Sequence, residues 1–470
     1  MTPSPQKPSA KADKHIKSGR LSIMSRFKFR PTVPRILALG YMGVILLGSF
    51  LLSLPISSKT GEWTPYINAL FTSTSATCVT GLITYDTFMH WTLFGQIVVI
   101  LLIQVGGIGF MTVVTLFSFA LGRRIGLYER IILAQSAGAM GHGGVVKLVK
   151  RIIIFTFSVE LVGALLLMIR FIPDYGAGNG IWFSIFHSIS AFCNAGFDLM
   201  GINGTAFSSL TRYVGDPLVN LTICALIVIG GMGYVVWSDI WDKKFRYKKY
   251  RLHTRIVLCS TFILVFLPAL LIYAFEYDGV LAGMGAGESF LACLFQSVTP
   301  RTAGFNTLPL NELSESTLLL MDILMLIGGN SGSTAGGIKV TTIVVILFGL
   351  YSSVRGQKEI VIGKRSVDLS LVKQAMSLFA IYLILTMLAV MIICAIEPYT
   401  LSQVLFECCS AICTVGLTTG ITPSLTAGSK VILILLMYAG RVGVLTLAGA
   451  MMAKPKPSLT SRPHEKILIG

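Results

Sequence analysis

The sequence has few charged residues, and few acidic ones in particular. Only 13% of its 470 residues are charged and 54% are hydrophobic, with 21 Asp and Glu against 38 Lys and Arg. Soluble proteins carry about 25% charged residues on average, so ordinary soluble enzymes and DNA-binding domains are excluded. The charges gather in short clusters between apolar stretches long enough to cross about 30 Å of hydrocarbon. The composition therefore predicts an all-α polytopic membrane protein.

Patterns typical of enzymes and metal proteins are also missing. The nine cysteines show no paired metal-ligand spacing, and the histidines stand apart from any nucleophile or ligand pattern. The spans hold no paired catalytic carboxylates. We expect no enzymatic activity and no covalently bound cofactor.

The positive charge falls almost wholly on one side of the predicted membrane. All but seven of the 38 Lys and Arg lie in the segment 1–35, in the loops 122–151, 239–255 and 355–373, and after position 452. This positive-inside bias places both termini and the three loops in the cytoplasm. Anionic membrane lipid accounts for basic clusters at such positions, so we expect lipid contacts and no nucleic acid. The segment 1–34 lacks a cleavable signal pattern and is predicted to be a basic cytoplasmic arm.

A short glycine-containing string recurs four times at nearly constant spacing, with its glycine at positions 81, 196, 304 and 416. A Ser-Ala pair stands at a fixed offset before the glycine in three copies, and the third copy has Val298-Thr299 there. A second glycine pair follows downstream of each string, with Gly440-Arg441 as its relic in the fourth copy. The strings themselves are Val79-Thr80-Gly81, Asn194-Ala195-Gly196, Thr302-Ala303-Gly304 and Thr414-Val415-Gly416.

Each copy is predicted to contain a long helix, an outer linker, a short apolar helix, the glycine string and a second long helix. A helix of about 12 residues rises only about 18 Å and cannot span, so each short helix is expected to re-enter from outside. The second long helices are expected at about 91–121, 217–238, 317–350 and 430–452. Eight spans and four re-entrant helices result, in pore units 35–121, 122–241, 242–350 and 351–453, with the arm 1–34 and a cytoplasmic tail 454–470.

The non-helical strings inside the membrane indicate a cation pore. Lipid cannot satisfy their backbone groups, whereas a pseudo-fourfold ring around water directs carbonyls and helix C-terminal dipoles at the axis, where a dehydrated cation binds. Close helix packing is the alternative explanation for a single glycine, but four glycines at matched offsets favour a filter. The tightest point is expected at the residues where a Cβ would obstruct the backbone, which are Gly81, Gly196, Gly304 and Gly416.

The four helix–pore helix–helix units with S-A-x-C-x-x-G-L/F strings resemble the Trk/Ktr/HKT superfamily of potassium transporters over residues 35–453. Eight spans without an additional N-terminal pair resemble its KtrB branch. The resemblance implies K⁺ as substrate at the four filter glycines and Na⁺ as a candidate activator. It also implies a homodimer bound to a cytoplasmic ring of nucleotide-binding, KtrA/RCK-like regulatory subunits. A Ser at the first filter position accompanies sodium selectivity in plant relatives, and this chain has Gly81 there.

The second helix of the third copy is interrupted by glycines and hydroxyl residues. No Gly-Lys-Ser/Thr follows, which argues against a nucleotide-binding loop. By resemblance this stretch is a gate loop below the filter, formed by Gly328, Gly329, Asn330, Ser331, Gly332, Ser333, Thr334, Ala335, Gly336, Gly337 and Lys339.

Arg441 is a costly residue for a spanning helix and is expected to face a cavity or a partner. Two roles stay open: a brace that binds helix-end carbonyls, or a positive barrier in the pore that contacts the gate loop. The predicted function is potassium uptake across the plasma membrane through a gated, channel-like pore. The alternatives are a coupled secondary cation transporter (K⁺/Na⁺ or K⁺/H⁺ symport), for which broken helices also occur, and a sodium-conducting relative.

Overall fold

The computed structural model describes residues 32–109, 112–113, 145–244, 246–357, 359–363, 365–444 and 446–447. These residues are mostly helical, with one antiparallel hairpin in which Ile360 pairs with Val367 and Ile362 with Arg365. The predictions for the arm up to position 31, for most of the loop 122–151 and for the tail 454–470 lie outside the described residues.

The helices follow the four predicted units in chain order. Unit 1 holds α1 (Val33–Ser53), η1 (Pro55–Ser57), α2 (Tyr66–Cys78), α3 (Thr87–His90) and α4 (Leu93–Ile108). Unit 2 holds α7 (Val145–Cys193), η2 (Met200–Asn203), η3 (Thr211–Tyr213), α8 (Pro217–Gly231) and α9 (Tyr234–Lys243). Unit 3 holds η4 (Tyr247–Lys249), α10 (Leu252–Glu276), α11 (Ala286–Val298), η5 (Leu310–Glu312), α12 (Glu315–Leu326) and α13 (Val340–Val354). Unit 4 follows β1 (Ile360–Ile362) and β2 (Arg365–Val367) and holds α14 (Leu369–Ile396), α15 (Leu401–Ile412), η6 (Thr422–Ser424) and α16 (Ala427–Val442).

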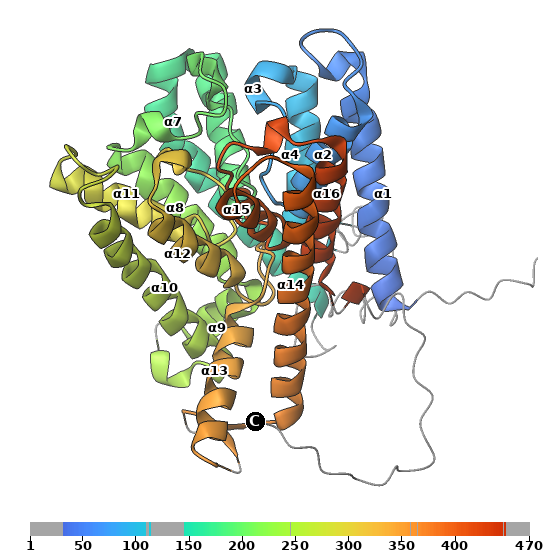
Figure 1. The fold of residues 1–470 in the computed structure, drawn as a ribbon. Coiled ribbons are helices and arrows are strands. Elements are labelled where there is room, and N and C mark those ends of the chain that lie inside the picture. Colours follow the sequence, from blue (N-terminus) through green and yellow to red (C-terminus); the bar gives the residue numbers. More distant parts are fainter. Residues whose placement is uncertain are drawn as a thin grey trace, which may run out of the picture.

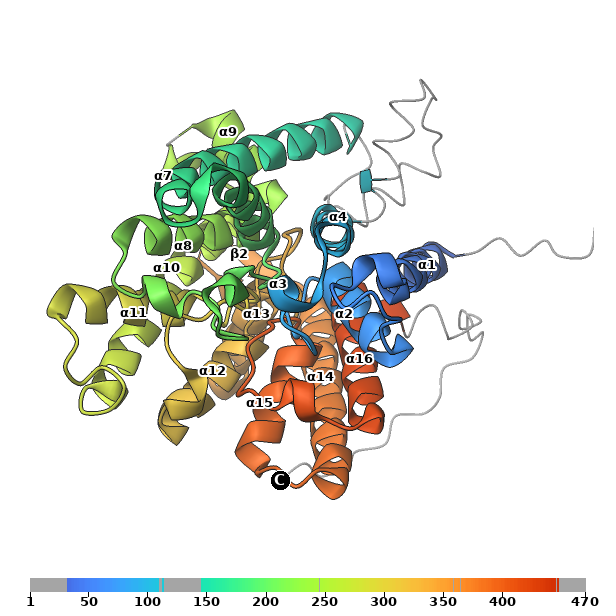
Figure 2. The same cartoon turned by 90° about the horizontal axis from the view of Figure 1, so that it is seen from above.

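The units are arranged as a closed ring. Seen from above, the colours pass around the molecule in chain order and α16 returns beside α2 (Figure 2). Neighbouring units meet through α4 with α7, α8 with α11, α12 with α15, and α16 with α2. Figure 1 shows the helices from the side, with α1 at one edge of the molecule and α10 and α11 at the other.

The outer helices present apolar side chains outward. Leu47 on α1, Leu270 on α10 and Met391 on α14 are each more than 60% exposed. Four helices of the described residues are long and apolar enough to cross a membrane, namely Val33–Ser53, Val146–Cys193, Leu252–Glu276 and Leu369–Ile396. The first helix of every unit is therefore present, as predicted.

The second helices break in every unit, which corrects the prediction of continuous helices at about 91–121, 217–238 and 430–452. Gly109, Gly233 and Gly443 adopt φ of 91°, 94° and 87°, which only glycine adopts readily. Each stands three positions after the first glycine of the downstream pair. At Gly233 the chain bends by 93° between α8 and α9. By length alone the described residues thus supply four spans, or five with this bent pair, and the count of eight remains a prediction.

The second helices all begin at a residue whose side chain accepts a hydrogen bond from the first turn. Such N-caps satisfy amide groups that a helix start leaves unpaired. The four capping residues are Thr92, Asp216, Ser314 and Thr426.

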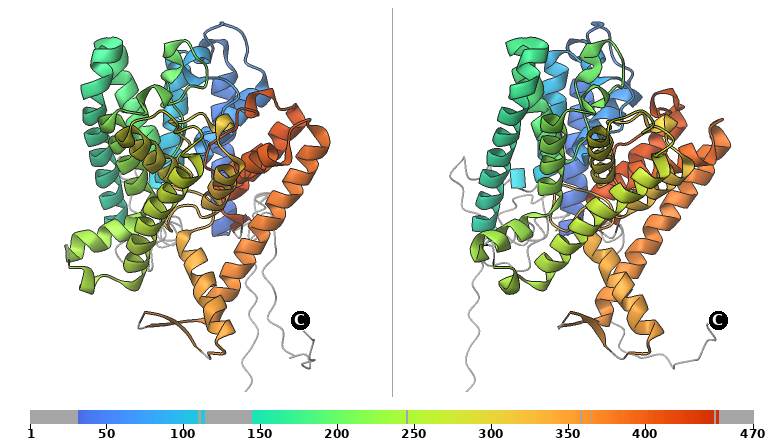
Figure 3. Two further views of the ribbon diagram at one scale, coloured as in Figure 1. Left: turned by 60° about the vertical axis from the view of Figure 1, so that its left-hand side comes forward. Right: turned by 90° about the vertical axis from the view of Figure 1, so that its left-hand side faces the viewer.

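The short helices have the predicted length in three units. The helices α2, α11 and α15 contain 13, 13 and 12 residues. In unit 2 the short helix is continuous with the long one in α7, and the chain turns at Gly176, where φ is 80° and ψ 164°. Phe71, Phe186 and Phe406, which share one position in the repeat, are fully buried behind the strings. The helices α13 and α14 project beyond the ring and carry the hairpin at their tip (Figure 3).

Candidate functional site

The four string glycines lie against one another at the centre of the ring. A methyl group on each glycine would approach the carbonyl oxygen of the residue just before the glycine of the next unit. The distances are 2.6 Å for Gly81 and Ala195, 2.7 Å for Gly196 and Ala303, 2.7 Å for Gly304 and Val415, and 2.1 Å for Gly416 and Thr80. The contacts close in the order of units 1, 2, 3, 4 and 1, so a Cβ is excluded at all four positions.

The residue two positions before each glycine is left-handed, a feature that the sequence did not reveal. Val79, Asn194, Thr302 and Thr414 have φ of 58°, 60°, 70° and 53°. Three of them are β-branched, and such residues rarely adopt positive φ. Strain of this kind costs about 1 to 3 kcal/mol per residue and persists where the surroundings enforce it. The four strings therefore share one unusual backbone path.

Hydroxyl groups at the ends of the short helices hold the strings in place. Ser75 and Ser410 each accept a hydrogen bond of 3.0 Å from the amide of the string glycine. Ser190 donates to the Phe197 carbonyl at 2.7 Å. In unit 3, Thr299 donates to the corresponding carbonyl of Phe305. The third copy thus replaces Ser by a hydroxyl one position later, which explains its divergent Val298-Thr299 pair.

The first glycine of each downstream pair lets the second helix approach the end of the short helix. A methyl group would lie 2.1 Å from the Thr77 carbonyl at Gly106, 1.9 Å from that of Phe192 at Gly230, and 2.0 Å from that of Ile412 at Gly440. In unit 3 the equivalent Gly328 instead lies against its own loop, where the Gly336 carbonyl would be 2.7 Å away.

Replacing Gly230 by alanine is expected to destabilise the protein although alanine favours a helix by about 1 kcal/mol. Overpacking of this kind typically costs about 1 to 3 kcal/mol, so the melting temperature of the purified protein should fall by several degrees. Gly231→Ala is the matched control, because a methyl group there would lie 3.5 Å from the nearest atom, on Asn194. Equal melting temperatures for the two variants would contradict the packing role.

Residues 328–339 form a loop directly against the strings. Thr334 donates to the Phe192 carbonyl at 3.2 Å, and Asn330 donates to the Gly231 carbonyl through its backbone and side-chain nitrogens. At Gly336 a methyl group would lie 1.9 Å from the Thr414 hydroxyl. The Lys339 ammonium turns back onto the carbonyls of Ala335 and Gly336 at 2.7 and 3.0 Å. The loop therefore contacts units 2 and 4 next to their strings.

Arg441 connects this loop to unit 1. One terminal nitrogen of its guanidinium donates to the Thr334 carbonyl and the other to the Gly106 carbonyl. Thr334 lies in the loop, and Gly106 lies just before the break in the second helix of unit 1. The side chain thus makes both contacts that the sequence left open, one to the loop and one to a helix end.

Sequence reasoning assigned no partner to Glu160 or Arg301. The Glu160 carboxylate accepts two hydrogen bonds of 3.1 Å from Gln104, which links α7 to α4 behind the second string. Arg301 is 4% exposed and lies 3.5 Å from the Thr261 hydroxyl of α10. Its side chain thus packs behind the third string.

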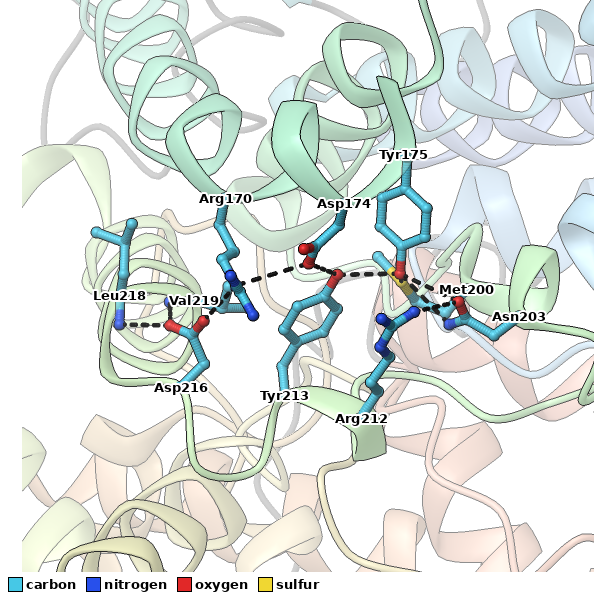
Figure 4. Close-up of polar contacts among 10 residues, drawn as sticks. All are labelled: Arg170, Asp174, Tyr175, Met200, Asn203, Arg212, Tyr213, Asp216, Leu218 and Val219. Atoms are coloured by element: carbon cyan, nitrogen blue, oxygen red, sulfur yellow. Dashed lines mark hydrogen bonds and ion pairs between the residues drawn. The ribbon is translucent and has the colours of Figure 1, made fainter. Parts of the chain in front are cut away.

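The outer surface of unit 2 carries an ordered polar network (Figure 4). Arg170 forms ion pairs with Asp216 at 2.9 Å and with Asp174 at 3.6 Å. The Tyr213 hydroxyl donates to Asp174 at 2.8 Å, and Arg212 donates to Asn203 at 3.0 Å. These contacts fasten the polar stretch 201–217, because of which the string and the following glycine pair lie farther apart in the second copy than in the others.

Comparison with known proteins finds similarity along nearly the whole length of the chain. The family model TrkH, described as "Cation transport protein", matches residues 29–462. The chain belongs to this family. Members of the TrkH family are membrane cation transporters and not enzymes, and this chain is accordingly a multi-pass membrane protein.

Two relatives that are named as uptake proteins match almost all of this TrkH family chain. The Ktr system potassium uptake protein B of Bacillus subtilis is 42% identical over 94% of this chain and 97% of its own length. The potassium/sodium uptake protein NtpJ of Enterococcus hirae is 38% identical over 95% of this chain and 99% of its own length. Among solved structures, the potassium transporter TrkH from Vibrio parahaemolyticus shares the fold, with a TM-score of 0.71 and 19% identity, over 90% of this chain and 86% of that chain.

Proposed function

We propose that this chain takes up potassium across the cell membrane through a gated, channel-like pore. The observation that carries the proposal is the closed ring in which each string glycine faces the carbonyl of the next unit. Rings of backbone carbonyls replace the hydration shell of a cation in selectivity filters. The fold and the potassium-uptake relatives support the same function.

The roles of the site residues follow from this proposal. The filter consists of residues 79–81, 194–196, 302–304 and 414–416, with K⁺ held at the level of the four glycines. The loop 328–339 restrains conduction from the cytoplasmic side, and Arg441 is the pore barrier that holds the loop. Each pore unit, 35–121, 122–241, 242–350 and 351–453, contributes one quarter of the ring.

We further propose the assembly and the orientation. Both termini lie in the cytoplasm, since the basic loops lie there by charge. The chain forms a homodimer, each copy with its own pore, on a cytoplasmic ring of nucleotide-binding KtrA/RCK-like subunits. The Ktr system to which a 42% identical relative belongs supports a separate regulatory partner. Sodium is proposed as an activator, because NtpJ is a potassium/sodium uptake protein.

The direct test is uptake in cells that lack their own potassium uptake. Expression should restore growth at low potassium and give uptake of potassium and rubidium well above that of sodium. Adding sodium to potassium medium should raise the rate. Sodium uptake equal to potassium uptake would favour the sodium-conducting alternative, and fixed co-movement of protons or sodium would favour a coupled symporter.

Deleting residues 330–336 is expected to raise potassium flux at least tenfold, because this removes Asn330, Thr334 and Gly336, which hold the loop against units 2 and 4. Flux is measured per purified, monodisperse protein in vesicles, without the regulatory subunits. Deletion of the hairpin 360–367, at the tip of the projecting helices, is the control; in vesicles of phosphatidylcholine alone, which supply no anionic lipid, it should leave the rate without a regulator unchanged. A folded loop-deletion protein that conducts at the unmodified rate would show that the loop is only a tolerated break.

A further inference from the structure

A deep groove lies between α10 and α13, outside the ring of strings. It has a volume of about 710 Å³ and is bounded at one end by the β1–β2 hairpin. Its walls include Cys259 and Ile263 of α10 with Ile343 and Leu347 of α13. These walls are mainly aliphatic, so the groove is suited to hydrocarbon.

The cytoplasmic end of the groove is positively charged. Arg255 and Arg365 line it there, and none of its lining residues is acidic. One terminal nitrogen of Arg255 donates to the Lys248 carbonyl, and its guanidinium lies 5.6 Å from the Tyr247 ring. The Arg255 Nε atom, however, is buried without a hydrogen-bond partner among the described residues. A buried donor without a partner costs about 1 to 3 kcal/mol, so a rotation of the Arg255 side chain that turns Nε toward an anion at this end would supply the missing acceptor.

The depth of the groove matches one leaflet of a bilayer. Along α10 the lining runs from Leu252 to Leu264, and the part from Arg255 to Leu264 covers nine residue steps or about 13.5 Å. Half of a hydrocarbon core of about 30 Å is about 15 Å. An acyl chain attached to a headgroup at Arg255 would therefore run along the whole groove.

The inner end of the groove reaches the base of the gate loop. Ile327 and Val340, the two residues that flank the loop, both line the groove. Ile327 forms a bridge to Ile338, and the Val340 amide donates to the Gly329 carbonyl at 3.1 Å. Whatever fills the groove therefore packs against both ends of the loop.

We propose that an anionic phospholipid occupies this groove, with its phosphate at Arg255 and Arg365 and one acyl chain along α10 and α13 to the base of the loop. The bound lipid stabilises the loop in the position seen in the structure. The proposed lipid binding does not rest on the proposed function, whereas the expected effect of the lipid on potassium flux does.

Binding is tested by photo-crosslinking of the full-length protein in vesicles that contain phosphatidylglycerol with a photoreactive acyl chain. Cross-links should map to peptides of α10 and α13, and the phosphatidylcholine analogue should give at least fivefold fewer. Arg255→Gln and Arg365→Gln should each reduce the yield at least threefold. Lys373 is an exposed charged residue of α14 on the same side and does not line the groove, so Lys373→Gln should leave the cross-linking yield unchanged. Equal labelling by both lipids, no response to either arginine change, or protein–protein cross-links from a second copy or from the chain's own termini would overturn the proposal.

The effect on the loop is tested by potassium flux into two sets of vesicles, one of phosphatidylcholine alone and one in which part of it is replaced by phosphatidylglycerol. Wild-type flux should differ at least threefold between the two compositions, and Ile343→Trp, which fills the groove, should remove that difference while protein yield is kept. Cross-linking without a change of wild-type flux would refute the link to the loop. Cross-linking with no potassium flux in any vesicle would contradict the proposed function and leave the lipid site in place.

Discussion

Gly81→Ser is expected to lower potassium uptake, or its preference over sodium, by at least tenfold. The Ser Cβ would lie 2.6 Å from the Ala195 carbonyl and 3.1 and 3.2 Å from the α-carbons of Gly416 and Gly196. The φ of 102° at Gly81 adds strain for any residue with a side chain. The two neighbouring strings, 194–196 and 414–416, must move to make room, so the ring that would bind the ion loses its geometry. A tenfold change corresponds to about 1.4 kcal/mol.

The control for this variant comes from the same unit. Gly61 also has a positive φ, 71°, but nothing lies within 4 Å of a methyl group there. Gly61→Ser therefore reproduces the backbone strain without the collision and should leave selectivity unchanged. Uptake of potassium, rubidium and sodium is measured for both variants at equal protein level. Unchanged rate and selectivity in well-expressed Gly81→Ser protein would remove the filter assignment.

Arg441→Ala is expected to raise flux by up to about a thousandfold. A guanidinium is always charged and opposes a passing cation by about 4 kcal/mol at about 4 Å and an effective dielectric near 20. A barrier lowered by about 1.4 kcal/mol raises the rate tenfold. The change also removes the donor that holds the Thr334 carbonyl, so the gate loop loses its connection to the Gly106 carbonyl of unit 1.

A second substitution distinguishes the barrier from a purely structural brace. Arg441→Lys keeps the positive charge but cannot reach both carbonyls with the same fork of donors. If the charge is the barrier, the Arg441→Lys protein should conduct slowly and the Arg441→Ala protein fast. If the two hydrogen bonds alone matter, both variants should lose thermal stability and behave alike in flux per folded protein. The measurements are tracer uptake in vesicles and melting temperature of monodisperse protein, and unaltered flux with lowered stability in Arg441→Ala would refute the barrier role.

The repeat was the part of the fold that the sequence predicted best. The spacing of Gly81, Gly196, Gly304 and Gly416 placed four glycines at equivalent positions, and the structure brings them into mutual contact. The approximate length of the short helices followed from hydrocarbon thickness. These features depend on local composition and on a nearly constant repeat length, which one sequence displays directly.

The breaks in the second helices could not be predicted from hydropathy. Gly109, Gly233 and Gly443 lie in apolar segments, where an isolated glycine is also tolerated within a helix. The repeated G-x-x-G spacing from Gly106, Gly230 and Gly440 was nevertheless visible and could have signalled the break. The cause lies in tertiary packing, since Gly106, Gly230 and Gly440 each pack against the end of a short helix.

The left-handed residues were also beyond sequence reasoning, and for Arg441 the sequence offered two kinds of partner but identified neither residue. Val79 and Thr414 carry no local preference for positive φ, so their backbone is imposed by the hydroxyls of Ser75 and Ser410 and by the closed ring. The contact of Arg441 with Thr334 joins residues 107 positions apart. Only the packing of units 1, 3 and 4 around the loop brings them together.

The most direct test of the central claim is anomalous diffraction from crystals of the protein grown with rubidium in place of potassium. If the ring holds a cation, we expect a strong anomalous peak on the axis between the carbonyls of Thr80, Ala195, Ala303 and Val415. Added potassium should weaken this peak much more than an equal concentration of sodium. Well-diffracting crystals with no peak between these carbonyls, or with rubidium only at another site, would contradict the proposed filter.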